Sequence, residues 1–168
     1  MFHPTIFREY DIRGIADKEF DEKFAFELGC ALGTLLKGNK KTSVAIGRDL
    51  RLTSEKYTNA VMNGLIQTGI TVYHIGFCPT PVLYFALFNY PVDGGMMITA
   101  SHNPPEYNGF KICEGRNALY GKDLLVLKKI IDEKSYSTSA NKGARIEIKA
   151  NDDYFSDIQK RISLSRQL

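Results

Sequence analysis

The chain has 168 residues, 43% hydrophobic and 24% charged, which is enough for one domain with its own core and too few for a second of ordinary size. Its net charge of +3 comes from 22 basic and 19 acidic residues scattered along the chain, so the sequence shows neither a nucleic-acid-binding arm nor a polybasic membrane segment. Three cysteines without CxxC spacing, no signal peptide and no apolar run of membrane-spanning length predict a cytoplasmic protein that binds neither nucleic acid nor membrane.

The first two thirds of the chain alternate between strand and helix patterns. An extended opening is expected over residues 5–12, followed by a helix whose apolar residues recur at helical spacing until Gly38. After it we expect, in order, a strand at 43–46, a helix from 53 to 69, a strand at 70–75, a helix at 81–88 and a strand at 93–99. Strands alternating with helices predict a sheet covered on both faces.

The remaining third is more irregular. Short strands are expected at 109–113 and 117–120, a helix at 124–131, a loop at 134–143 and a last strand at 144–148. The predicted fold class is therefore α/β, a three-layer α/β/α sandwich with a small mixed sheet. From Asp152 onward the apolar residues Tyr154, Phe155, Ile158 and Ile162 form an amphipathic pattern. We expect one domain over residues 1–150 and the truncated start of a second domain over 151–168.

A polar loop follows the strand at 93–99, with the sequence Thr99-Ala-Ser-His-Asn-Pro-Pro105. In an open α/β sheet this loop lies at the carboxyl edge, where ligands bind. Ser101 could accept a phosphoryl group, His102 could donate to it, and Asn103 with the prolines could fix the loop. The same residue types also dominate ordinary turns, so from the residues alone a plain polar turn is an equal alternative.

The stretch Thr99-Ala-Ser-His-Asn-Pro104, followed by Tyr107-Asn-Gly-Phe-Lys111, resembles the active-site signature of the α-D-phosphohexomutase superfamily, and within it the bacterial phosphomannomutase/phosphoglucomutase enzymes. The resemblance implies that Ser101 carries a phosphoryl group, gives it to a phosphosugar and takes another back from the bisphosphorylated intermediate. It implies that Lys111 is a general acid/base. The alternative for Lys111 is a solvated lysine on a strand.

Two further stretches resemble the family. In Phe7-Arg-Glu-Tyr-Asp-Ile-Arg-Gly14 the resemblance assigns Tyr10 and Arg13 to the active site, and Arg13 is favoured over Arg8 as a phosphate ligand. In Gly47-Arg-Asp-Leu-Arg-Leu-Thr-Ser54, Arg48 and Asp49 are expected to support the serine loop. The alternative for this neighbouring pair is a structural ion pair. We also expect Ser101, Arg13, His102 and Lys111 to cluster around one anion site.

The family's enzymes have four domains, so the resemblance covers only the phosphoserine domain. It implies a Mg²⁺ cofactor, of which this chain would supply one ligand, the Ser101 phosphate, and a hexose 1,6-bisphosphate activator. The expected partners are hexose phosphates and the remaining domains of a parent enzyme, with this chain inactive by itself. The alternatives are a free-standing phosphosugar-binding domain without turnover and a fragment of a phosphoglucosamine mutase.

Overall fold

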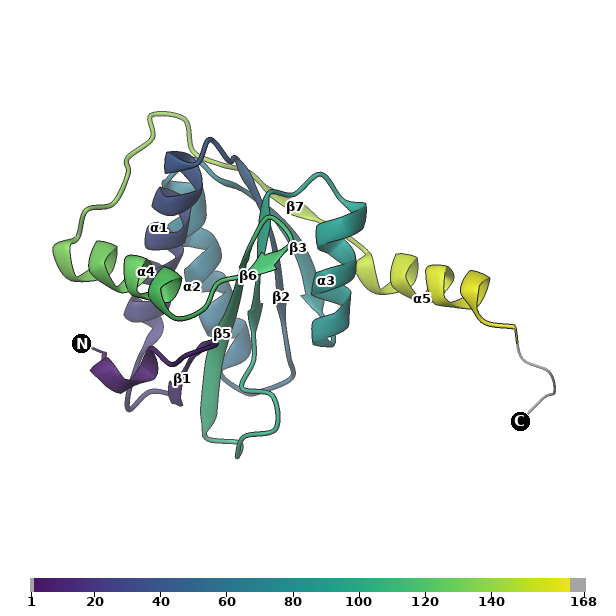
Figure 1. The fold of residues 1–168 in the computed structure, drawn as a ribbon, viewed down its shortest axis with the longest axis horizontal. Coiled ribbons are helices and arrows are strands. Elements are labelled where there is room, and N and C mark those ends of the chain that lie inside the picture. The colour runs from purple at the N-terminus through teal and green to yellow at the C-terminus, as the bar shows by residue number, and fades with distance from the viewer. Residues whose placement is uncertain (1, 164–168) are drawn as a thin grey trace.

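The computed structural model describes residues 2–163 (Figure 1). The strands are β1 (Ile12–Ile15), β2 (Ser43–Arg48), β3 (Thr71–Phe77), β4 (Gly94–Ile98), β5 (Tyr107–Glu114), β6 (Asn117–Ala118) and β7 (Arg145–Glu147). The helices are a short 3₁₀ turn (Pro4–Ile6), α1 (Glu22–Gly38), α2 (Ser54–Gln67), α3 (Thr80–Asn89), α4 (Lys122–Glu133) and α5 (Ala150–Arg161).

The strands form one mixed sheet in the order β1-β5-β4-β2-β3-β7, and the two-residue β6 pairs with β5. The strands β4, β2, β3 and β7 run parallel, whereas β5 is antiparallel to both β4 and β1. Of these parallel strands, β2 is joined to β3 through α2 and β3 is joined to β4 through α3, because a parallel connection needs a crossover long enough to return the chain to the same edge.

Helices cover both faces of this sheet, as Figure 1 shows. One core lies between the sheet and the helices α1, α2 and α4, and it contains Phe24, Val61 and Phe110. A smaller core lies on the other face, where Val82 and Leu83 of α3 pack against Met97 of β4. The predicted three-layer α/β/α sandwich with a mixed sheet is therefore confirmed.

The helix predicted to end at Gly38 is α1, and its boundaries follow from the sequence. The Asp21 side chain accepts a hydrogen bond of 2.8 Å from the Phe24 N–H and so caps the first turn. The residues predicted to face the core are buried, apart from a half-buried Leu35 at the last turn. Because the helix also carries small residues, it packs closely against α2, the neighbour with which it makes most of its contacts.

The expected strand at 5–12 is wrong. Pro4 begins a 3₁₀ turn, which suits a residue with a fixed φ and no N–H. The chain then reverses in a tight turn, in which the Arg8 N–H donates to the Asp11 carbonyl at 2.9 Å and Phe7 pairs with Ile12. Regular strand therefore begins only at Ile12, where β1 adds to the edge of the sheet beside β5.

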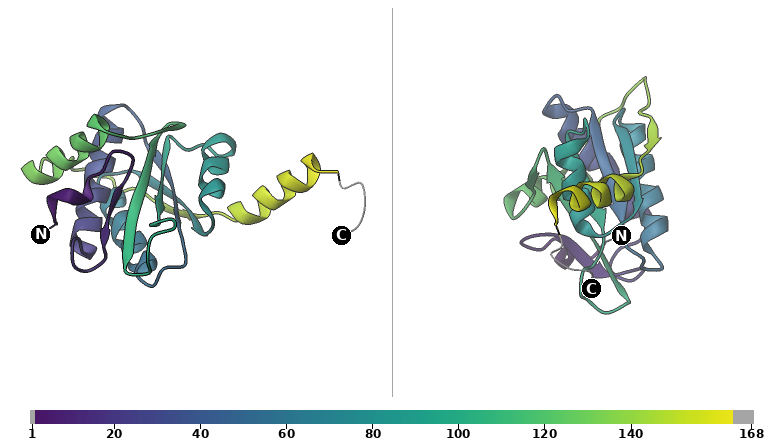
Figure 2. Two further views of the ribbon diagram at one scale, coloured as in Figure 1. Left: turned by 60° about the horizontal axis from the view of Figure 1, so that its bottom comes forward. Right: turned by 90° about the vertical axis from the view of Figure 1, so that its right-hand side faces the viewer.

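The last described helix, α5, projects away from the rest of the molecule (Figure 2). Its first turn is anchored, because Ala150 is fully buried and the Tyr154 ring packs edge-on against Phe85 of α3 with centroids 5.5 Å apart. Farther along, Phe155 and Ile162 are exposed. The domain boundary near residue 150 stays a prediction, and residues 1 and 164–168 of the two proposed segments lie outside the described residues.

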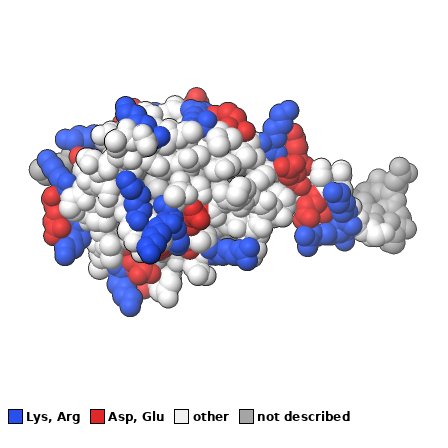
Figure 3. Space-filling view, turned by 90° about the horizontal axis from the view of Figure 1, so that it is seen from above, with Lys and Arg blue, Asp and Glu red and all other residues white. Residues whose placement is uncertain are grey.

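The surface charge is mixed on the end of the molecule opposite the β4–β5 loop. There Lys and Arg alternate with Asp and Glu, and no broad area of one sign is visible (Figure 3). Among the described residues no helix is both long and apolar enough to cross a bilayer.

Candidate active site

A cleft of about 800 Å³ opens at the carboxyl ends of β2, β3 and β4. Its walls are the segments that follow these strands, Asp49–Leu52, Cys78–Thr80 and the Ser101 loop, with Met97 of β4 also lining it. The helix that follows β2 packs on one face of the sheet and the helix that follows β3 packs on the other. The connections therefore diverge here, which is where open α/β sheets bind ligands.

Ser101 lies in this cleft in a left-handed backbone conformation, with φ of +55°. A serine adopts this conformation at a cost, and such positions are enriched at functional sites. The Ser101 N–H donates to the Thr99 hydroxyl at 3.0 Å, whereas its own hydroxyl is exposed and lies 3.4 Å from Nδ1 of His102. The serine is thus fixed by its backbone, and its exposed oxygen has the His102 ring as its one described hydrogen-bond partner.

Asn103 closes the turn around Ser101. Its side-chain amide donates to the Ala100 carbonyl at 2.8 Å, and its backbone N–H donates to the same carbonyl at 3.1 Å. This geometry supports the predicted role of Asn103 in holding the loop, a role that stays a prediction until the residue is changed.

The predicted supports Arg48 and Asp49 behave differently from one another. Arg48 pairs with Glu55 of α2 at 3.2 Å and donates to the Asp49 backbone carbonyl at 3.3 Å, and the described residues show no ion pair between the Arg48 and Asp49 side chains. Asp49 instead pairs with Arg51 at 3.2 Å, and the Arg51 guanidinium donates to carbonyl groups of the serine loop. Arg51 was missed by the sequence reasoning, although it stands inside the stretch that drew attention to Arg48 and Asp49.

Arg13 and Lys111 meet at a common carboxylate, Asp11. Arg13 lies 3.2 Å and Lys111 3.5 Å from Oδ2 of Asp11, whose side chain is 7% exposed. Arg13 is opposite Gly109 in the register of β1 and β5, two positions before Lys111, so both cations project from the same face. That face carries Met97, which is opposite Lys111 and lines the cleft. Sequence reasoning did not single out Asp11.

The four residues expected around one anion site thus fall into two pairs. Ser101 and His102 line the cleft, while Arg13 and Lys111 lie on the same sheet face but outside its lining. Tyr10 is 73% exposed in the turn that precedes β1 and makes no described contact with the loop. The active-site roles of these residues remain predictions.

The motif that ends at Lys111 also has a structural task. Asn108 is fully buried and donates from its amide to the hydroxyls of Thr53 and Ser54, at 2.8 and 3.0 Å. At Gly109 a Cβ atom would lie 2.4 Å from the Ile12 carbonyl oxygen, so only glycine lets β1 approach β5 this closely. Asn108 and Gly109 therefore hold the strand that presents Lys111.

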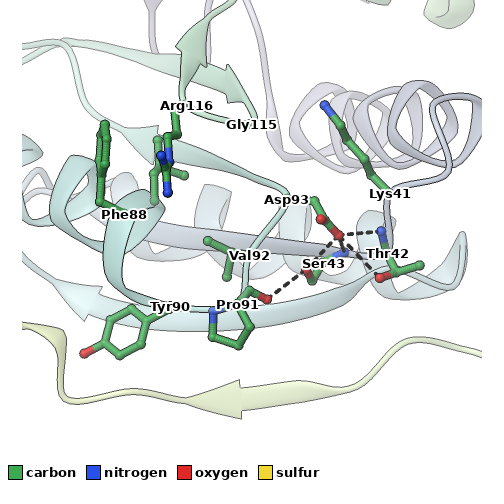
Figure 4. Close-up of a pocket in the computed structure, with 11 residues that line it drawn as sticks. Lys41, Thr42, Ser43, Phe88, Tyr90, Pro91, Val92, Asp93, Gly115 and Arg116 are labelled. Carbon is green, nitrogen blue, oxygen red and sulfur yellow. Dashed lines mark hydrogen bonds between the residues drawn. The ribbon is translucent and has the colours of Figure 1, made fainter.

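A second hollow, of about 450 Å³, lies at the opposite end of the sheet, around Asp93 and Arg116 (Figure 4). Its two main charged groups already have contacts within the protein. The Arg116 guanidinium lies over the Phe88 ring, 4.5 Å from the centroid, and the Asp93 carboxylate accepts hydrogen bonds from Thr42 and Ser43. The Ser101 cleft instead carries an exposed hydroxyl on a left-handed turn, which favours it as the functional site.

Asp93 should make the fold sensitive to acid. Burial by itself raises the pKa of its carboxyl, but hydrogen bonds from the Thr42 N–H and from the N–H and hydroxyl of Ser43 outweigh it, so the pKa lies below its ordinary value. A lowered carboxylate pKa stabilises the folded state above the unfolded pKa of about 4, and this contribution is lost as the pH falls through the folded pKa.

We expect Asp93→Asn to lower the free energy of unfolding at pH 7 by about 1 kcal/mol, because the amide cannot accept as many hydrogen bonds. The variant should also lose less stability than the unchanged chain between pH 5 and pH 3, as measured by urea denaturation. The matched control is Asp152→Asn on the exposed side of α5. An equal acid response of the unchanged chain and Asp93→Asn would contradict this prediction.

Comparison with known proteins identifies the family to which the chain belongs. The family model of phosphoglucomutase/phosphomannomutase, alpha/beta/alpha domain I, matches residues 4–138. The chain belongs to this family. The phosphoglucomutase of Neisseria meningitidis serogroup B is 36% identical over 163 residues, which are 97% of this chain and 35% of that enzyme. The phosphoglucomutase/phosphomannomutase of Thermococcus kodakarensis is 45% identical over 111 residues, 65% of this chain and 24% of that protein.

The fold of the chain is also that of the family. A crystal structure of a phosphoglucomutase/phosphomannomutase family protein from Burkholderia thailandensis superposes with a TM-score of 0.93 at 34% identity, covering 99% of this chain and 38% of that protein. The chain thus spans about a third of the length of the relatives it matches. What the full-length family members do can be carried to this chain only as a proposal.

The described residues do not fit a complete Mg²⁺ site. No group of three or more His, Cys, Asp or Glu side chains within residues 2–163 could hold a metal ion. Asp49, the carboxylate of the cleft wall, is committed to Arg51 and to the Ser54 hydroxyl, which donates to it at 2.6 Å. A phosphate on Ser101 would be one ligand, and Mg²⁺ prefers six oxygen ligands.

Proposed function

We propose that this chain is the phosphoserine-bearing domain of a phosphohexomutase that interconverts hexose 1-phosphate and hexose 6-phosphate. The observation that carries the proposal is the exposed Ser101 hydroxyl, held on a left-handed turn in the cleft at the carboxyl end of β4, in a chain of the phosphoglucomutase/phosphomannomutase family. Which hexose the parent enzyme prefers is set by residues outside this chain, so glucose and mannose are equal candidates and glucosamine is the alternative.

The proposed reaction moves one phosphoryl group in each direction. A hydroxyl oxygen of the sugar phosphate attacks phosphorus on Ser101, the bond from phosphorus to the Ser101 oxygen breaks, and the bisphosphorylated sugar forms. The second half-reaction returns the other phosphoryl group to Ser101. Hexose 1,6-bisphosphate is therefore the activator that phosphorylates an empty serine.

The chain's own residues supply positioning and charge in this scheme. His102 donates a hydrogen bond to the phosphoryl oxygens, and Arg13 presents a planar pair of donors to phosphate. In each half-reaction Lys111 takes the proton of the attacking hydroxyl and gives a proton to the leaving oxygen, which is the Ser101 oxygen in the first half-reaction and the sugar oxygen in the second. Asp11 supports this assignment, because its contacts with both Arg13 and Lys111 place these two side chains beside each other.

Cysteine chemistry is not part of the proposal, although Cys78 lines the cleft. Burial raises the pKa of the Cys78 thiol to about 11, so the thiol stays protonated at neutral pH and is a poor nucleophile. The three described cysteines are free and buried, which agrees with a cytoplasmic location, the compartment of hexose phosphates.

The test is the intact mass of the chain before and after several hours with glucose 1,6-bisphosphate and Mg²⁺. We expect the mass to rise by one phosphoryl group, and peptide sequencing to place that group on Ser101. Ser101→Ala should take up none, because its side chain has no oxygen to accept the group.

The matched control is Ser135→Ala, which removes an exposed serine at the end of α4 and should leave phosphoryl uptake unchanged. Phosphate on another residue, or uptake that persists in Ser101→Ala, would contradict the proposal. A chain that binds hexose phosphates in a calorimeter and never gains the phosphoryl group would instead be a binding domain without turnover.

A further inference from the structure

The Arg51 side chain lies against the serine loop and is almost fully covered, with 12% of it exposed. Its Nη1 donates to the carbonyl oxygens of Pro104 and Tyr107, at 2.6 and 2.9 Å. Its Nη2 donates to those of Ser101 and Asn103, at 3.1 and 2.7 Å. One guanidinium thus gathers four carbonyl groups that span the whole turn from Ser101 to the start of β5.

Asp49 fixes the direction of this guanidinium. Its Oδ2 lies 3.2 Å from Nε of Arg51, and its Oδ1 accepts the Arg51 backbone N–H at 3.0 Å and the Ser54 hydroxyl at 2.6 Å. The Asp49 N–H in turn donates to the Ile98 carbonyl of β4 at 3.0 Å. Through Asp49, the Arg51 guanidinium is therefore held next to the end of β4, where the serine loop begins.

The loop's own backbone supplies few donors for these carbonyls: the Tyr107 N–H donates to the Pro104 carbonyl at 3.1 Å, in addition to Arg51. Pro104 and Pro105 have no N–H, and the prolines leave the turn short of groups that could satisfy its carbonyls. The left-handed φ of +55° at Ser101 is also unfavourable for a serine and persists only where the surroundings hold it. An arginine carries five hydrogen-bond donors in a rigid planar fork, so it can bind several carbonyl groups at once. A lysine, whose charge is concentrated on one nitrogen, cannot bind them in this arrangement.

The bonds from Arg51 to the loop carbonyls also determine which groups of the loop face a phosphate. Peptide bonds are planar, and no cis peptide is present in the described chain, so the His102 N–H points opposite to the Ser101 carbonyl and away from Arg51. Within residues 2–163 this N–H has no hydrogen-bond acceptor. It belongs to the residue that follows Ser101, and a backbone N–H without an acceptor is a group that can bind an anion.

We propose that Arg51 is a positioning residue for phosphoryl transfer, an inference that rests on the proposed role of Ser101. By drawing four loop carbonyls to itself, Arg51 holds the left-handed turn, keeps the negative ends of those carbonyl dipoles away from the phosphoryl group, and leaves the Ser101 hydroxyl and the His102 N–H directed to the incoming group. Arg51 acts through the backbone and does not touch the substrate.

The experiment compares the unchanged chain with Arg51→Ala, Arg51→Lys and the control Arg116→Ala, which removes an exposed arginine at the far end of the sheet. The first measurement is amide hydrogen exchange of peptides from residues 99–108, with α1 as the internal reference. The second is the rate at which glucose 1,6-bisphosphate phosphorylates Ser101, followed by intact mass. The third is the same rate for Arg51→Ala with added methylguanidinium.

We expect exchange in the loop to rise at least about tenfold in Arg51→Ala while α1 is unchanged, because only the loop loses its hydrogen bonds. We expect phosphorylation of Ser101 to slow by about a hundredfold, the effect of a small misplacement of a reacting group. Arg51→Lys should keep the thermal midpoint of the unchanged chain and still phosphorylate slowly. Methylguanidinium should restore part of the rate in Arg51→Ala and none in Ser101→Ala.

A loop that keeps its protection and its phosphorylation rate in Arg51→Ala would overturn the inference, and so would a full rate in Arg51→Lys. If Arg51→Ala does not fold, Arg51→Lys decides the question. If the unchanged chain gains no phosphoryl group, the proposed function of Ser101 is contradicted, whatever the role of Arg51. In that case the exchange measurement still shows whether Arg51 holds the loop, so the two failures are distinguishable.

Discussion

Replacing Gly64 by alanine is expected to lower the free energy of unfolding by about 2 kcal/mol or more, a large effect for the addition of one methyl group. A Cβ atom at Gly64 of α2 would lie 2.2 Å from the Phe26 carbonyl oxygen and 2.8 Å from the Cys30 backbone nitrogen of α1. Both are backbone atoms, so no side-chain rotation can make room and the two helices have to separate. The loss of packing exceeds the roughly 1 kcal/mol that alanine gains over glycine in helix propensity.

Thermal denaturation followed by circular dichroism measures this effect, as a fall in Tm of roughly 4–8 °C. The matched control is Gly38→Ala, since a Cβ atom at Gly38 meets nothing within 4 Å at the end of α1. That variant should be as stable as the unchanged chain or slightly more so. Equal stability of Gly64→Ala and the unchanged chain would show that the helix crossing is not as tight as the structure has it.

This close crossing illustrates what the sequence could predict and what it could not. The spacing of the apolar residues placed α1 and α2 correctly, because burial against a sheet imposes the helical period on the sequence. Which glycines allow contact between the helices depends on atoms of the other helix. From the sequence alone, Gly29 is simply a residue of low helix propensity inside a helix. In the structure, a Cβ atom at Gly29 would lie 2.2 Å from the Val61 carbonyl oxygen.

The candidate site divides in the same way. The loop around Ser101 could be located because it follows a buried strand and resembles a family signature. The opening segment was predicted as a strand over 5–12, and it instead contains a 3₁₀ turn and a reversal at Arg8, because local hydrogen bonds there outweigh the extended pattern. The partnership of Asp11 with Lys111 joins residues 100 positions apart, so it depends on the antiparallel pairing of β1 with β5.

Arg51 was missed for a related reason. An arginine two residues after an aspartate in a loop suggests at most a local ion pair, and that pair with Asp49 does form. Its four bonds to the serine loop exist only because β2 and β4 are neighbours in the sheet, although the 45 residues 49–93 separate the end of β2 from the start of β4 in a crossover through β3. The sequence could predict that a proline-rich turn needs a side-chain hydrogen-bond donor, but it could not predict which residue supplies that donor.

The chain by itself is expected to show no measurable conversion of glucose 1-phosphate to glucose 6-phosphate, even if Ser101 becomes phosphorylated slowly. A single transfer over hours needs only the serine and a reactive donor. Turnover needs the sugar phosphate to be bound in two orientations, one for each phosphoryl transfer, with the charge of the phosphoryl group neutralised in both. The chain covers 35% of the Neisseria meningitidis phosphoglucomutase, so about two thirds of such an enzyme lies outside the part that it matches.

The decisive comparison is between this chain and a chimera in which it replaces the matching 163 residues of the Neisseria meningitidis enzyme. Both are assayed with Mg²⁺ and glucose 1,6-bisphosphate, each alongside its Ser101→Ala variant. We expect the chimera to turn over at least about a thousandfold faster than the chain alone, because orientation of the substrate is worth several powers of ten in rate. Ser101→Ala should abolish the activity of the chimera. Robust turnover by the chain alone that disappears in Ser101→Ala would show that this domain contains a complete site, and that the cleft beside Ser101 binds and orients the sugar without any help from other domains.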